Sequence, residues 1–293
     1  MSASATDALR AWIERLTAPG ASPDRDEARA AVRDLLDALE RGTVRAAAPG
    51  PEGWQAVPWV KSGILLAFRS GGTREFTAHP AAENPDFGGS TIQFFDRDTL
   101  PLRDTHGVEE NVRIVPGGSS VRGGAYLGPG VVIMPPAFVN IGAYVDEGAM
   151  IDSHALVGSC AQVGKRVHLS AGAQLGGVLE PVGLRPVVIE DDAMIGGNTG
   201  IFEGTLIGRR AVIAPGVQLT ASTAVYDLAR ETVYRAGDEG PLSIPDGAVV
   251  VPGSRPATSG WAKAQGLSLY APAIVKYRDE KTDAATALEE ALR

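Results

Sequence analysis

The stretch VDEGAMIDSHALVGSCAQVG, residues 145–164, repeats an aliphatic residue every six positions. The repeated residues are Val145, Ile151, Val157 and Val163, and an alanine stands four positions after each of the first three. Helices repeat at 3.6 residues and strands at 2, so neither element explains a period of six. Internal repeats at a fixed period are typical of a solenoid, in which short elements wind around a common axis.

The same six-residue register covers most of the chain. Aliphatic residues recur in steps of six from Val115 over residues 115–175, and again over 189–225. In a hexapeptide β-helix, three short parallel strands form a triangular coil of roughly 18 residues, and the aliphatic side chains stack along its axis. Ile244 and Val250 extend the pattern after a polar interruption. We therefore predict a mainly β protein, built on a left-handed parallel β-helix of hexapeptide repeats.

The repeats divide the chain into three predicted parts. Residues 1–110 lack the period and predict an N-terminal α/β domain. Residues 111–253 form the β-helix, and residues 254–293 form a small C-terminal extension. Segments before the first coil and after the last one would cover strand edges that are otherwise open.

Within the N-terminal part, apolar residues at helical spacing predict helices around residues 9–16 and 32–39. The apolar run GILLAFR, residues 63–69, predicts a strand, and the composition of residues 70–92 predicts a loop.

Two segments interrupt the hexad register. Residues 176–188 carry Gly and Pro at both ends and predict a loop that leaves one corner of the coil. Residues 227–243 are polar and predict a second excursion, for which a hairpin is one form. The last eight residues, 286–293, read as a short C-terminal helix.

Composition limits the classes of function. The chain has 293 residues, 44% of them hydrophobic, with a formal net charge of −8, which disfavours nucleic acid as a partner because phosphate binding needs a basic face. The single cysteine, Cys160, excludes a disulfide framework. No signal-peptide core and no membrane-spanning apolar run are visible, so we expect a soluble, cytoplasmic protein without a membrane partner.

Three classes of protein use this architecture: acyl-CoA transferases, zinc-dependent hydratases and non-catalytic scaffolds. A zinc hydratase needs about three histidines around one metal. The chain has four histidines, and His154 and His168 are 14 residues apart, which is not a whole coil. We therefore expect no metal site.

Long motifs narrow the choice further. VNIGAYVDEGAMIDSHALVGSCAQVGKRVHLSAGAQLGGVLEP (139–181) and VVIEDDAMIGG (187–197) closely resemble the tetrahydrodipicolinate N-succinyltransferase family. VKSGILLAFR (60–69), NVRIVPGGSSVRGGAYLGPGVVIMP (111–135) and LSLYAPAIVK (267–276) follow the same family in matching order. The resemblance implies transfer of succinyl from succinyl-CoA to the amino group of open-ring tetrahydrodipicolinate, in lysine and diaminopimelate biosynthesis. It also implies a homotrimer with active sites between subunits, and no prosthetic group.

The resemblance assigns two residues to the dicarboxylate amine. Arg113 matches the family's substrate-binding arginine, and a guanidinium can grip a carboxylate through two hydrogen bonds. Asp152 matches the substrate-binding aspartate and could orient the amine and remove its proton. Because Asp152 follows the inward Ile151, it should point outward from a rigid corner. Taken alone, Asp152 could simply bond its own backbone in a turn, and Arg113 could be solvated.

The sequence departs from the family at two places. Ser153 and His154 stand where relatives carry threonine and tryptophan, and Gly200 stands where they carry a glutamate; Glu203 still matches. Without that carboxylate, His154 becomes an alternative candidate for the base. The simpler interpretation is that His154 packs at an interface. Cys160 reads as a small corner residue, because no histidine is placed in the sequence to activate it.

Coenzyme A requires cations for its phosphates. The candidates near the C-terminal coils are Arg209, Arg210, Arg255 and Lys263, each of which could instead be a solvated surface residue. The runner-up functions are a related N-acyltransferase with another acyl donor, such as acetyl-CoA, or another amine, and a β-helix scaffold whose site has decayed.

Overall fold

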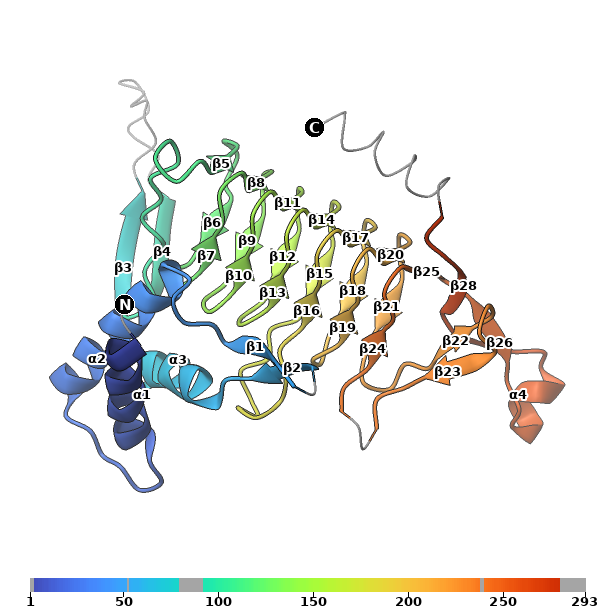
Figure 1. Cartoon of the computed structure of the whole chain (residues 1–293), viewed down its shortest axis with the longest axis horizontal. Coiled ribbons are helices and arrows are strands. Elements are labelled where there is room, and N and C mark those ends of the chain that lie inside the picture. The colour runs from blue at the N-terminus through green and yellow to red at the C-terminus, as the bar shows by residue number, and fades with distance from the viewer. Residues whose placement is uncertain (1–2, 52, 79–91, 238–239, 280–293) are drawn as a thin grey trace.

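The computed structural model describes residues 3–51, 53–78, 92–237 and 240–279. A helical domain lies at one end of a stack of triangular coils, and small hairpins lie at the other end (Figure 1). The fold is the expected mainly β architecture, a left-handed parallel β-helix with an N-terminal domain. In the described residues no helix is long and apolar enough to cross a membrane.

Three parallel sheets form the sides of the prism, and each coil contributes one two-residue strand to each sheet. The first sheet contains β7 (Tyr126–Leu127), β10 (Tyr144–Val145), β13 (Gln162–Val163), β16 (Val188–Ile189), β19 (Leu206–Ile207) and β24 (Ser243–Ile244). The second contains β5 (Arg113–Ile114), β8 (Val132–Ile133), β11 (Met150–Ile151), β14 (His168–Leu169), β17 (Met194–Ile195), β20 (Val212–Ile213) and β25 (Ala248–Val251). The third contains β6 (Ser120–Val121), β9 (Phe138–Val139), β12 (Leu156–Val157), β15 (Gln174–Leu175), β18 (Gly200–Ile201) and β21 (Gln218–Leu219).

The second residue of each strand points into the prism. Along the second sheet, Ile133, Ile151, Leu169, Ile195 and Ile213 stack in register and are at most 1% exposed. Burying each such side chain stabilises the fold by about 1.5–3 kcal/mol relative to exposure. The small residues four positions later are buried at the corners, as the hexad pattern predicts.

The predicted register is wrong in the first coil. Strand β5 pairs with β8 through Ile114 and Ile133, so Ile114 takes the inward position that the period assigns to Val115. The following corner, which contains Gly117 and Gly118, holds one extra residue before Val121. Both glycines have positive φ angles, 143° and 94°, which lets the longer turn close.

The N-terminal domain contains α1 (Ala3–Thr17), α2 (Arg25–Glu40) and α3 (Pro58–Ser70), with a hairpin of β1 (Ala47–Gly50) and β2 (Gly53–Ala56) between the last two helices. The side chain of Asp24 caps α2 by accepting hydrogen bonds from the backbone N–H groups of Asp26 and Glu27. A further antiparallel pair, β3 (Thr73–Ala78) and β4 (Ile92–Arg97), follows α3.

Two predictions for this domain are wrong. Residues 63–69 lie in α3 and form no strand, because Val60, Ile64 and Ala67 recur at helical spacing and bury one face. Short apolar runs do not distinguish the two elements by themselves. The predicted loop over 70–92 begins inside α3 and contains β3, while residues 79–91 lie outside the described part.

The domain docks on the first sheet through Arg45. Its guanidinium lies 3.6 Å from the ring centroid of Tyr144 and 5.2 Å from that of Trp54. Its Nε donates a hydrogen bond of 2.9 Å to Oε1 of Gln162. Trp54 in turn donates to Glu190. Cation–π contacts are worth most when the cation is desolvated, so this sandwich ties the domain to three successive coils.

The loop after β15 is held by a buried lysine. Lys61 of α3 is fully buried, and its Nζ donates hydrogen bonds of 3.1 Å to the carbonyl of Pro181 and 2.8 Å to that of Leu184. Burial lowers the pKa of Lys61. The next residue of the loop, Arg185, donates to the carbonyl of Gly204. The predicted loop over 176–188 is therefore confirmed, and side-chain hydrogen bonds hold its second half.

The C-terminal part closes the other end of the prism. The predicted hairpin within 227–243 is confirmed, with β22 (Val225–Asp227) antiparallel to β23 (Thr232–Tyr234). Strand β28 (Ala273–Tyr277) pairs with β25 and β22 and so extends the second sheet. Between them lie β26 (Ser254–Pro256), α4 (Gly260–Ala264) and β27 (Ser268–Tyr270). The expected helix over 286–293 lies outside the described residues.

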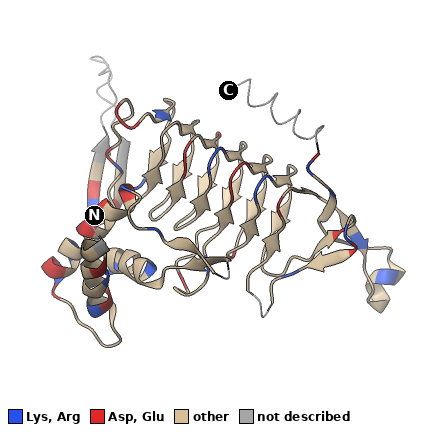
Figure 2. Cartoon of the chain, viewed as in Figure 1, with Lys and Arg blue, Asp and Glu red and all other residues tan. Residues whose placement is uncertain are grey.

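The corner between the first and second sheets, here called the ionic edge, carries charges that alternate in sign from coil to coil (Figure 2). Successive coils present Asp146 and Glu147, Lys165 and Arg166, Asp191 and Asp192, Arg209 and Arg210, and Asp246. Ion pairs join neighbouring coils: Lys165 with Glu147 at 3.0 Å, Arg166 with Asp192 at 2.7 Å and Arg209 with Asp191 at 3.6 Å. If one coil were left out of the stack, two coils with the same charge at this edge would become neighbours. The alternation therefore favours the native order of the coils.

The ionic edge gives a stability prediction. Arg166→Glu replaces a two-bond ion pair with repulsion from Asp192, and we expect the free energy of unfolding to fall by about 0.5–1 kcal/mol. Added salt should reduce the difference because the edge is exposed. The charge-swapped variant Arg166→Glu with Asp192→Arg is the control and should recover most of the loss. Equal thermal midpoints for the native protein and Arg166→Glu at low salt would contradict this role.

Candidate functional site

Asp152 lies at the corner between the second and third sheets, here called the Asp152 edge. It follows β11 directly, and its Oδ1 accepts a hydrogen bond of 2.6 Å from the backbone N–H of Ser153. Its Oδ2 lies 3.9 Å from Nε2 of His168 on the neighbouring strand β14. The side chain is 31% exposed, so it can be reached from outside while its position is restricted. Asp152 thus makes the backbone hydrogen bond expected of an aspartate in a turn. That bond uses Oδ1, and Oδ2 is the oxygen that remains for other interactions.

His154 lies on the same corner and faces a groove. Its φ angle is +62°, an uncommon conformation that turns the chain toward the third sheet. The groove has a volume of about 390 Å³ and is lined by Phe138, Leu156, Gln174 and His154. Gln174 donates to the carbonyl of His154 over 3.0 Å, which fixes the floor of the groove.

Arg113 is brought to the same side of the prism as Asp152. It is the exposed first residue of β5 and pairs with Val132, which pairs with Met150 just before the Asp152 corner. Two strand spacings separate Arg113 from Met150, or about 10 Å. Arg113 and the strand that leads into Asp152 therefore belong to the same sheet, two coils apart.

Gly200 lies on the third sheet, two strands beyond the β12 strand that follows Asp152, and its neighbours fill the space beside it. A Cβ atom built on Gly200 would lie 2.2 Å from Oε1 of Gln218 and 2.4 Å from Cε2 of Phe202. A Cβ on Gly176, one coil earlier, would lie 2.7 Å from Cδ1 of Phe202. The Phe202 ring therefore packs on two glycines, and a glutamate at position 200 would require it to move.

The four predicted phosphate-binding cations do not gather in one place within the chain. Arg255 lines a cavity of about 320 Å³ together with Gln218 and Tyr270, at the far end of the third sheet from His154. Lys263 is exposed on α4, in the same C-terminal segment. Arg209 and Arg210 lie on the ionic edge, where Arg209 pairs with Asp191.

Two other residues from the sequence have local structural roles. Glu203 accepts a hydrogen bond of 2.6 Å from the backbone N–H of Ala221, one coil further on. Cys160 is fully buried in a corner against the N-terminal domain, and burial raises the pKa of its thiol to about 12. A thiol in that environment is inert, which agrees with its predicted packing role.

Sequence reasoning missed two residues. His168 was considered only as a zinc ligand, and Phe202 was not considered. For His168 the sequence contains a signal. It occupies an outward position of the hexad, and the equivalent positions in the two coils on either side hold valine or methionine. For Phe202, the contact with Gly176, 26 residues earlier, depends on the length of the loop after β15, which the period does not fix.

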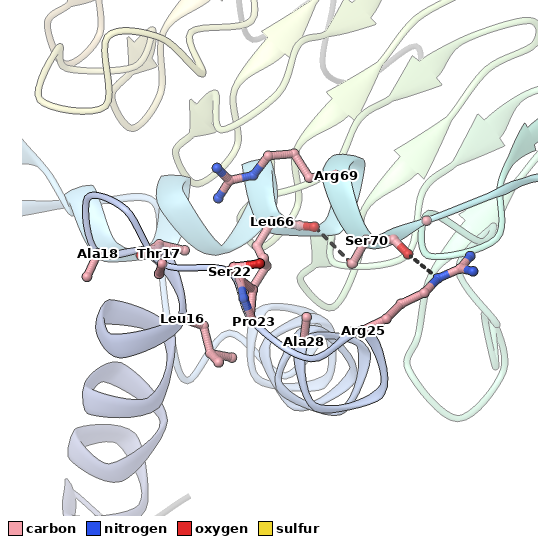
Figure 3. Close-up of a pocket in the computed structure, with 12 residues that line it drawn as sticks. Leu16, Thr17, Ala18, Ser22, Pro23, Arg25, Ala28, Leu66, Arg69 and Ser70 are labelled. Atoms are coloured by element: carbon pink, nitrogen blue, oxygen red, sulfur yellow. Dashed lines mark hydrogen bonds between the residues drawn. The ribbon is translucent and has the colours of Figure 1, made fainter.

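A cavity of about 540 Å³ lies in the N-terminal domain, between the α1–α2 connection and the end of α3 (Figure 3). Arg25 and Arg69 are on its wall, and Arg25 donates to the carbonyl of Ser70. None of the residues that line it belongs to the β-helix. Across residues 3–51, 53–78, 92–237 and 240–279, no group of three or more His, Cys, Asp or Glu side chains is arranged to hold a metal ion.

Two segments of the chain match profiles of known protein families. Residues 7–70 match the family profile described as tetrahydrodipicolinate N-succinyltransferase N-terminal, and residues 186–221 match the hexapeptide repeat of succinyl-transferase. A solved Campylobacter jejuni protein titled as a tetrahydropyridine-2-carboxylate N-succinyltransferase covers 88% of this chain and 64% of its own, with 16% identity and a TM-score of 0.45, and is too distant to add to the assignment.

Two curated relatives are much closer. The 2,3,4,5-tetrahydropyridine-2,6-dicarboxylate N-succinyltransferase of Ralstonia nicotianae is 40% identical over 97% of this chain and 96% of its own. The enzyme of the same name from Alkalilimnicola ehrlichii is 43% identical over 90% of each chain. With identity at this level over nearly its whole length, the chain belongs to the tetrahydrodipicolinate N-succinyltransferase family.

Proposed function

We propose that the protein transfers the succinyl group of succinyl-CoA to the amino group of open-ring tetrahydrodipicolinate, within lysine and diaminopimelate biosynthesis. The observation that carries this proposal is the near full-length identity to enzymes with that name. The geometry supports it, because Arg113 and Asp152 lie on one side of a rigid prism beside an open groove.

The chemistry needs few groups. Arg113 would bind one carboxylate of the acceptor, and Oδ2 of Asp152 would accept the proton of the attacking amine. The C–N bond forms at the thioester carbonyl as the C–S bond breaks, and the released thiolate takes up a proton to give free CoA. With Gly200 in the chain, Asp152 acts without a second carboxylate at that position.

The third sheet gives the donor a path. The cavity at Arg255 lies near β21, and the groove at His154 lies on β9, β12 and β15. Strands β12 and β21 are three spacings apart, or about 14 Å. CoA phosphates held near Arg255 and Lys263 would let an extended pantetheine arm reach the Asp152 edge.

The proposal includes a homotrimer around the second sheet. The outward residues of this sheet form a column that is apolar over most of its length: Val132, Met150, Met194, Val212 and Val249. Three prisms that turn this sheet toward a three-fold axis would bury the column, and cyclic symmetry is a common way to cover such a surface. Each Asp152 edge would then face the ionic edge of a neighbour, with Arg209 and Arg210 three coils beyond the level of Asp152. The cytoplasmic location stays a prediction.

The first test of function is a thiol-release assay with tetrahydrodipicolinate. We expect CoA release from succinyl-CoA, and slower release from acetyl-CoA. Release at least tenfold faster from acetyl-CoA would favour the related N-acetyltransferase, and no release from either donor would favour a scaffold. Omission of the acceptor is the control for simple hydrolysis.

The second test concerns the base. Asp152→Asn keeps the shape and removes the proton acceptor, so kcat should fall by roughly 100- to 10,000-fold. The melting temperature should barely change, because the side chain is partly exposed and its bond to Ser153 can be kept. His154→Ala is the matched comparison on the same corner and should cost less. A near-normal kcat for Asp152→Asn beside an inactive, folded His154→Ala would move the base to His154.

The third test concerns assembly. Met194→Glu places a charge in the middle of the proposed interface and should give monomers by sedimentation, with loss of activity. Val108→Glu is the control, since Val108 is 98% exposed in the loop before β5. A native protein that sediments as a monomer, or a Met194→Glu variant that remains a trimer, would contradict the second sheet as the interface.

A further inference from the structure

The outward column of the second sheet contains one residue that packing does not explain. From β5 to β25 its seven described members are Arg113, Val132, Met150, His168, Met194, Val212 and Val249. Arg113 lies at the exposed end, while His168 lies between Met150 and Met194 and is only 6% exposed. A valine or methionine would fill this position at no polar cost, whereas burying an imidazole is unfavourable unless it gains an interaction.

The carboxylate of Asp152 is placed where it could supply such an interaction. Nε2 of His168 lies 3.9 Å from Oδ2 of Asp152, which is longer than a hydrogen bond. Oδ1 of the same carboxylate is already held by the N–H of Ser153 at 2.6 Å. The oxygen that faces His168 is therefore the one left for chemistry, and catalytic hydrogen bonds often tighten only when substrate binds.

The elements beside His168 place two residues at its ring. Asp152 follows strand β11, and Met194 lies beside the ring on strand β17. Two residues before His168, Arg166 forms a two-bond ion pair with Asp192 on the ionic edge. Of these residues, Asp152 is the one whose carboxylate lies 3.9 Å from Nε2 of His168.

We propose that His168 is a positioning residue for Asp152: its Nε2–H donates to Oδ2 and fixes the carboxylate at the angle from which it meets the acceptor amine. This inference rests on the proposed function, because it assigns His168 a part in the same site. His168 touches neither substrate nor donor. It holds Asp152 while the amine proton is transferred, and no proton leaves the imidazole.

A kinetic test separates positioning from packing. His168→Met matches the neighbouring column residues, so the protein should fold and melt as the native one does. A displacement of about 1 Å at a catalytic group can cost about 100-fold, and we expect a fall in kcat of that order with KM for tetrahydrodipicolinate little changed. His168→Gln, whose amide N–H can still donate, should recover part of the loss. Phe95→Leu, on the exposed strand β4 of the N-terminal part, is the control and should keep native kcat.

The double variant shows whether His168 acts through Asp152. In the Asp152→Asn background, His168→Met should cause no further loss of kcat, because the two residues form one unit. Independent, multiplicative losses would overturn the proposal. So would a native kcat for His168→Met, which would leave His168 a packing residue.

A spectroscopic test does not depend on activity. The chain has four histidines, so the imidazole nitrogens of protein labelled with ¹⁵N-histidine can be assigned by single substitutions. We expect His168 to carry its proton on Nε2, and Asp152→Asn to shift that resonance. If the native protein shows no transferase activity but the shift is present, the proposed function fails while the His168–Asp152 contact stands. An unprotonated Nε2, or a resonance that ignores Asp152→Asn, would overturn the contact itself.

Discussion

The stacking of one aliphatic side chain per hexad on its equivalents in the next coil is the constraint on which the rest of the structure depends. Each inward residue, such as Ile151 on Leu169, must meet its partner at the strand spacing, so the chain has to return to the same corner in every coil. That return fixes the outward residues as well. Columns of side chains then run along three faces and three edges, and the residues that the register places in a column decide its chemical character.

The faces and edges of the prism have different roles. The first sheet carries Tyr144 and binds the N-terminal domain through Arg45. The ionic edge sets the register of the coils through pairs such as Arg166 with Asp192. The second sheet offers an apolar column for assembly, and the third offers a groove for the donor. Asp152 stands where the second and third sheets meet, so in the proposed trimer a subunit contact and the donor path would converge on one carboxylate.

The period alone was enough to predict the β-helix, because aliphatic residues that recur in steps of six over so many repeats fit neither a helix nor an ordinary strand. It failed where local forces compete with the period. Ile114 replaces Val115 because two glycines allow a longer first corner. Residues 63–69 are helical because the burial that decides between helix and strand comes from packing against α1 and α2, which no short apolar run contains.

The site could be predicted only in part. The resemblance named Arg113 and Asp152, and the hexad register explains why they share one side. The hexad period does not predict how the chain re-enters the coils after an inserted loop. The neighbours of Gly200 therefore could not be predicted, nor could the separation of Arg255 from Arg209 and Arg210. His168 was visible as an outward residue, but its distance from Asp152 required coordinates.

The most direct test of the account is a structure of the protein with CoA and a non-reactive dicarboxylate analogue of the acceptor. The account predicts the pantetheine arm along the third sheet, from the cavity at Arg255 to the Asp152 edge. It also predicts the acceptor nitrogen within hydrogen-bond distance of Oδ2 of Asp152 and a carboxylate on Arg113. Ligands bound at another face, with Asp152 turned away from both, would contradict it.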